Sequence, residues 1–117
     1  MPDLEHYKKL AEKKHWKKLQ SAYEKSNEET RLLILEALGS AAAVDEVLNI
    51  LINEVNFPLN EQTQIAAINA LGSLGSQASR AKEHLTHQMN HLDEAAHPEL
   101  AQALRSAMTK MKTSDFD

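Results

Sequence analysis

Apolar residues recur every three or four positions along most of this chain, the spacing that places them on one face of an α-helix. The first two groups flank a break near Lys14-His15 and consist of Leu4, Tyr7, Leu10 and Ala11, then Trp16, Leu19, Ala22 and Tyr23. They predict two short helices rather than one long helix, with Trp16 in the core. No segment alternates apolar and polar residues with a period of two, so the sequence predicts no strand.

Capping residues mark where the next two helices begin and end. Ser26, with Glu29 three positions later, is typical of a capping box at a helix N-terminus. We expect that helix to end at Gly39, with the glycine in the left-handed conformation. Ser40 then predicts the cap of a helix over residues 41–55.

The second half of the chain carries similar signals. Asn60 predicts the start of a helix that ends at Gly72 or Gly75, and a further helix is expected over residues 76–91. Pro98 is expected at the first position of the last helix, where its missing N–H costs no hydrogen bond.

Part of this pattern repeats along the chain. Residues 29–39 align with residues 62–72, with Thr, Ala, Leu and Gly at matching positions, and a third copy without the glycine covers residues 99–108. The repeated unit is a helix, a tight turn and a second helix, which predicts a stack of helix pairs.

On these residues, and above all on the repeated Ala-Leu-Gly, the chain resembles the HEAT-repeat family in its short bacterial form. The resemblance covers residues 27–91 and extends more loosely to 1–26 and 97–112. It implies an all-α fold, an α-α superhelix of about three helix pairs and roughly seven helices. It implies one domain over residues 1–112, with 113–117 as a frayed tail, and second helices that line a concave, partner-binding face.

The sequence departs from this family in two places. Arg31 in one copy becomes Gln64 in the next, so the polar ladder between successive pairs is expected to be incomplete. The chain also has no His-Glu dipeptide, on which the iron-binding deoxyhypusine hydroxylases of the family depend. Phycobilin lyases contain this type of repeat too, but nothing in this sequence marks a chromophore site.

Composition narrows the function. The chain has no cysteine, which excludes disulfides, thiolate nucleophiles and sulfur-rich zinc sites. No apolar run approaches the length of a membrane span and no signal pattern precedes the first helix, so we expect a cytoplasmic protein. The net charge is −4, yet the first 25 residues carry seven Lys against four acids.

Two sets of residues suggest binding chemistry. His84, His87 and His91 form a stripe on one predicted helix and are candidate Zn or Ni ligands, the alternative being solvated polar residues. The second set is a basic patch that could contact phosphates or an acidic protein surface, and it consists of Lys8, Lys9, Lys13, Lys14, Lys17 and Lys18.

No arrangement indicates catalysis. The acidic residues of the middle region are expected on solvated helix faces and first turns, and they are Glu28, Glu29, Glu36, Asp45, Glu46, Glu54 and Glu61. We therefore expect a non-catalytic adaptor or scaffold without a cofactor that binds another protein, with nucleic-acid binding and metal binding as alternatives. Its expected contact residues are Asp45, Asn49, Asn53, Arg80, His84, His87 and His91. The partner's identity and the oligomeric state stay open.

Overall fold

The computed structural model describes residues 2–112, and all regular structure in this range is helical. The helices are α1 (Leu4–Glu12), α2 (Trp16–Lys25), α3 (Glu28–Leu38), α4 (Asp45–Asn56), α5 (Glu61–Leu74), the 3-10 helix η1 (Gly75–Ala81), α6 (Lys82–Asn90) and α7 (Pro98–Met111). The all-α prediction is confirmed. None of these helices is long and apolar enough to cross a membrane. The predicted frayed tail, residues 113–117, lies outside the described range.

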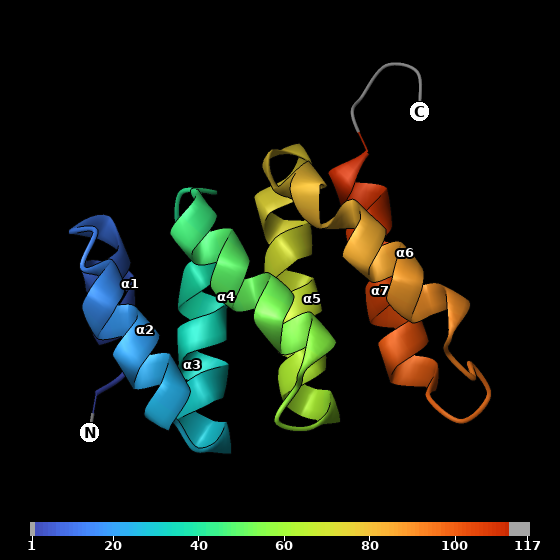
Figure 1. Ribbon diagram of the computed structural model, residues 1–117, viewed down its shortest axis with the longest axis horizontal. Coiled ribbons are helices and arrows are strands. Elements are labelled where there is room, and N and C mark those ends of the chain that lie inside the picture. The colour runs from blue at the N-terminus through green and yellow to red at the C-terminus, as the bar shows by residue number, and fades with distance from the viewer. Residues whose placement is uncertain (1, 113–117) are drawn as a thin grey trace.

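The helices form two layers (Figure 1). One layer contains α1, α3, α5 and α7, which contact one another in that order, and the other contains α2, α4 and α6. The molecule measures 37 × 34 × 17 Å, so it is a slab only two helices thick. Helices that follow one another in the chain thus alternate between the layers.

A single hydrophobic core fills the space between the layers. It is built from the apolar faces that the three-and-four spacing predicts, and its fully buried members include Leu19, Ile34, Leu51, Ile68, Leu85 and Leu104. The two ends of the slab expose polar residues. Examples are Glu5 and Lys9 on α1, and Gln102 and Arg105 on α7. The end helices therefore cover the core with polar outer faces.

Two glycines allow neighbouring helices of the first layer to approach closely. A Cβ on Gly39 would lie 3.2 Å from the Cα of Ala70, and one on Gly72 would lie 3.1 Å from the Cα of Ala107. The helix ends at Gly39 as predicted, but its φ of −65° is right-handed, so the left-handed expectation is wrong there. Gly75, with φ +67°, is the glycine that ends α5 in the left-handed region.

Two predicted helix starts are wrong. Asn27, not Ser26, caps α3, because its side chain accepts from the Thr30 N–H at 2.9 Å. The helix expected from residue 41 begins only at Asp45, because Ser40 bonds back to Ala37 and the chain needs residues 41–44 to reverse direction.

The region after Gly75 also differs from the prediction. It was expected to form one helix over residues 76–91, but it opens as the 3-10 helix η1, and α6 covers only Lys82–Asn90. Ala78 has non-helical backbone angles, so the chain is kinked inside η1 before α6 begins at Lys82. In contrast, Asn60 caps α5 and Pro98 begins α7 as expected.

Candidate functional site

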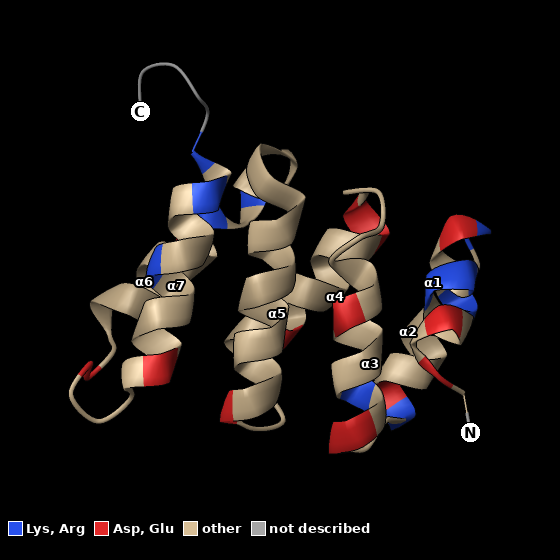
Figure 2. Cartoon of the chain, turned by 180° about the vertical axis from the view of Figure 1, so that it is seen from behind, with Lys and Arg blue, Asp and Glu red and all other residues tan. Residues whose placement is uncertain are grey.

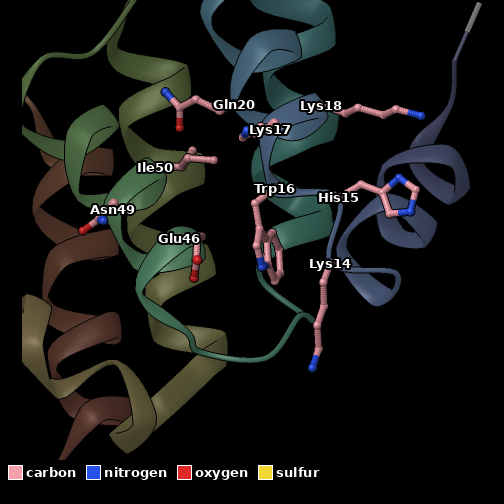
Figure 3. Close-up of a pocket in the computed structure, with 9 residues that line it drawn as sticks. All are labelled: Lys14, His15, Trp16, Lys17, Lys18, Gln20, Glu46, Asn49 and Ile50. Carbon is pink, nitrogen blue, oxygen red and sulfur yellow. The ribbon is translucent and has the colours of Figure 1, made fainter.

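A groove of about 750 Å³ lies between α2 and α4 (Figure 3). Its lining residues are Lys14, His15, Trp16, Lys17, Lys18, Gln20, Glu46, Asn49 and Ile50. Trp16 and Ile50 provide the apolar part of the surface. Trp16 was expected in the core, but it is only partly buried and lies against the core's edge. Its indole is therefore available to the groove.

The turn between α1 and α2 places the basic side of this groove. Lys14 has a φ of +60°, and the next amide, that of His15, bonds back to the Leu10 carbonyl at 2.9 Å. This tight reversal makes Trp16 the first residue of α2 and Lys17 the second. Figure 3 shows the Trp16 side chain beside the start of α4, and Lys17 lines the same groove.

The basic patch predicted from the sequence is divided in the folded chain. Lys14, Lys17 and Lys18 line the groove, whereas Lys8 lines two other hollows beside α3. Lys9 on α1 and Lys13 directly after it are exposed, and Figure 2 shows basic residues on this helix at one end of the molecule. Only half of the patch can therefore contact a molecule in the groove.

Three of the predicted partner-binding residues meet on the far side of the groove. The Arg80 guanidinium, from η1, donates to Asn49 Oδ1 at 3.0 Å and lies 3.7 Å from Asp45 Oδ1. Asn49 also lines the groove. A cluster of exposed polar side chains thus continues the groove from α4 toward η1.

The other predicted contact residues lie elsewhere. Asn53 donates to the Tyr23 hydroxyl at 2.9 Å, and His84 Nδ1 lies 3.0 Å from the side-chain nitrogen of Asn56, so both serve contacts between helices. The rings of His87 and His91 are 4.3 Å apart at the exposed end of α6. Across residues 2–112, no three His, Asp or Glu side chains gather as metal ligands would.

A buried polar cluster between α2, α3 and α4 is a feature that the sequence did not predict. Glu54, expected on a solvated face, is fully buried and accepts hydrogen bonds from Tyr23 at 2.5 Å, Arg31 at 3.0 Å and the Leu59 amide at 2.8 Å. Burial alone would raise the pKa of Glu54. This effect is outweighed by groups that stabilise the carboxylate, and the pKa of Glu54 is lowered. These groups are the hydroxyls of Thr63 and Tyr23, the Leu59 amide and the charge of Arg31.

The same cluster keeps Tyr23 protonated. Burial and the neighbouring Glu54 carboxylate raise the pKa of Tyr23 to about 12. The only sequence signal for the cluster was Arg31, the single basic residue between residues 26 and 79. All these buried polar groups have hydrogen-bond partners within the described chain. The cluster therefore holds helices together and leaves no buried donor or acceptor for a ligand.

Arg31 and Gln64 each donate a hydrogen bond to a carbonyl near the end of the preceding helix. Arg31 donates to the Tyr23 carbonyl at 2.8 Å, near the end of α2. Gln64 donates in the same way to the Val55 carbonyl at 2.9 Å, near the end of α4, and also to Gln88 Oε1 at 3.4 Å. Gln64 therefore keeps a side-chain hydrogen bond to the preceding helix, but its neutral amide does not replace the ion pair between Arg31 and Glu54.

Comparisons with protein-family models, with curated proteins and with solved structures find no match to this chain. The function must therefore be inferred from the groove and from the residues around it.

Proposed function

We propose that this chain is a non-catalytic adaptor or scaffold of the cytoplasm that binds another protein through the face formed by α2, α4 and η1. One observation carries the proposal. Two sets of residues chosen separately from the sequence, the basic residues Lys14, Lys17 and Lys18 and the contact residue Asn49, line one groove. The accessible indole of Trp16 supports this proposal, because Trp is enriched in protein-binding surfaces.

We also propose that the two layers are a HEAT-like stack of antiparallel helix pairs. The close approaches of Gly39 to Ala70 and of Gly72 to Ala107 are equivalent contacts in successive pairs. The hydrogen bonds of Arg31 and Gln64 to preceding helix ends are equivalent too. In such a stack the second helices of the pairs, here α2, α4 and α6, would supply the binding face.

Nucleic-acid binding is the second candidate. The observation that favours it is the position of Trp16 beside Lys14 and Lys17, because an aromatic ring can stack on a base while ammonium groups contact phosphates. The single carboxylate of the groove, Glu46, opposes it.

Affinity capture from a nuclease-treated lysate of the source organism tests the adaptor proposal. The variant Asn49→Arg places a bulky charge on the groove wall, and Asn69→Arg makes the same change at an exposed position of α5 in the other layer. We expect mass spectrometry to find proteins enriched by the wild type and by Asn69→Arg and lost with Asn49→Arg. Enrichment of no protein in any sample, or of nucleic acid alone when nuclease is omitted, would reject the proposal.

A further inference from the structure

Resting on the proposed function, we infer that the groove between α2 and α4 binds an acidic segment of the partner protein, and that Trp16 contacts an apolar side chain of that segment. Three features of the groove support this inference: its charge, its apolar surface and the polar groups of its α4 wall.

The charge of the groove is opposite to that of the whole chain. Lys14, Lys17 and Lys18 line it with Glu46 as the only carboxylate, whereas the chain as a whole carries a net charge of −4. A local positive surface on an acidic protein attracts negatively charged partners and repels positively charged ones. Carboxylates of the bound segment are therefore expected on the α2 side near Lys14 and Lys17, since Figure 3 shows the Lys18 side chain extended away from α4.

The apolar part of the groove lies between these lysines and α4. Trp16 is partly buried, and Figure 3 shows its indole directed into the space between α2 and the start of α4. Ile50 lies on the opposite wall and is itself 4% exposed. Partly exposed aromatic rings next to apolar side chains are typical anchor points for a partner's apolar residue.

The α4 wall adds a directional group. Arg80 donates to Asn49 Oδ1, which fixes the orientation of the Asn49 amide. The nitrogen of that amide donates to no residue within 2–112, so it is available to a backbone carbonyl of the bound segment. The groove thus offers ammonium groups on one side, an apolar centre and an amide donor on the other.

This distribution fits a peptide better than a nucleic-acid strand. A strand carries a phosphate at every nucleotide and needs a continuous positive track, with more than one stacking ring for a firm grip. Here Glu46 and the neighbouring Asp45 end the positive surface at α4, and Trp16 is the only Trp of the chain. An acidic segment can instead turn its carboxylates toward α2 and keep them away from Glu46.

A displayed library of short random peptides, selected on the full chain, tests this inference without knowledge of the natural partner. We expect the selected peptides to combine Asp or Glu with one large apolar residue and to shift the fluorescence of Trp16. Replacing the apolar residue of a selected peptide by Ser should remove the shift. Raising the salt concentration should weaken binding, because exposed charges are screened.

A matched pair of variants locates the binding site. Lys14→Gln/Lys17→Gln removes two charges from the groove, and Lys9→Gln/Lys13→Gln removes two exposed charges outside it, at α1 and its C-terminal end. We expect the groove variant to bind a selected peptide roughly fivefold to tenfold more weakly and the α1 variant to bind it like the wild type.

Several outcomes would overturn the inference. They are selection of neutral or basic peptides, no selection at all, equal loss of binding in both variants, or tighter binding of single-stranded DNA than of any peptide at the same salt. The first three can occur while the lysate still yields a partner that Asn49→Arg loses, and then the adaptor proposal stands and only the acidic-segment inference fails.

Discussion

Glu54 is a fully buried carboxylate in a chain with few charged groups inside. An unpaired charge at this depth would cost several kcal/mol of stability, and the penalty is reduced only by hydrogen bonds and an opposite charge. Tyr23 and Arg31 share its Oε1, and the Leu59 amide bonds to its Oε2. These bonds connect α2, α3, α4 and the loop after α4, so the cluster fixes how these three helices pack against one another.

Tyr23→Phe removes one hydroxyl from this cluster and leaves the ring. We expect it to lower the free energy of unfolding by about 1–3 kcal/mol, because Glu54 loses a donor and Asn53 loses its acceptor. Urea denaturation measures the change. Tyr7→Phe is the control, since Tyr7 is also buried but its hydroxyl bonds to no residue of the described chain. Equal effects of both substitutions would contradict a specific role for the Tyr23 hydroxyl.

The lowered pKa of Glu54 predicts a loss of stability in acid. Glu54 binds a proton less readily in the folded state than in the unfolded state, where the pKa of a glutamate is about 4.3. The stabilisation is therefore fully present above that pH and disappears as the pH falls through the folded-state value. We expect Glu54→Gln to be less stable than the wild type at neutral pH and to show a flatter decline in acid, measured by urea denaturation at a series of pH values. Parallel declines of the two proteins would argue against the shift.

At the level of elements, the sequence predicted which segments are helical better than where they begin. The spacing of apolar residues located the cores of α1 to α5 and of α7 correctly. Residues 41–44 lie outside α4 although three of them are Ala, the best helix former. The need to reverse the chain between two packed helices overrides this local preference, and no nearby residue signals where the reversal ends.

The candidate groove could be predicted only in part. The sequence selected Lys14 and Lys17 as part of a basic patch, and Asn49 as a polar position on a predicted helix. It did not place them together, since their distance depends on how α2 and α4 both pack on α3. The burial of Glu54 was missed for the same reason: its partners come from α2, α3 and the loop after α4.

The glycines of the first layer show a further limit of local rules. In the interior of a helix, Gly→Ala normally stabilises by about 1 kcal/mol. For Gly72 we expect Gly72→Ala instead to destabilise by about 1–3 kcal/mol, because the new Cβ would lie 3.1 Å from the Cα of Ala107, a backbone atom that cannot turn away. Thermal and urea unfolding check this.

Ser73→Ala is the control for Gly72→Ala, because Ser73 is the next residue of α5 and is exposed. It should be neutral or slightly stabilising through helix propensity alone. A stabilising Gly72→Ala would mean that α5 and α7 can separate slightly without loss, and that the glycine does not set their distance.

On the scale of the whole molecule, the core consists of interfaces between neighbouring helices. In the first layer α1 contacts α3, α3 contacts α5 and α5 contacts α7, and within residues 2–112 there is no extensive contact between α1 and α5 or α7. Stability in such an arrangement is approximately a sum of local terms and nearest-neighbour terms. We therefore expect the two ends of the slab to open separately, although one continuous core runs through it.

Two matched core substitutions test this separation. Leu19 of α2 and Leu104 of α7 are both fully buried, near opposite ends of the slab, and each change to Ala should cost about 2–5 kcal/mol. We expect hydrogen exchange followed by mass spectrometry to show faster exchange mainly in α1 and α2 for Leu19→Ala, and mainly in α6 and α7 for Leu104→Ala. The helices α3 to α5 should stay the most protected in both.

Uniform acceleration across all helices in either variant would mean that the slab opens as one cooperative unit. In that case a partner bound between α2 and α4 would stabilise α7 as strongly as α2, whereas separate opening confines its effect to the end of the slab that it contacts.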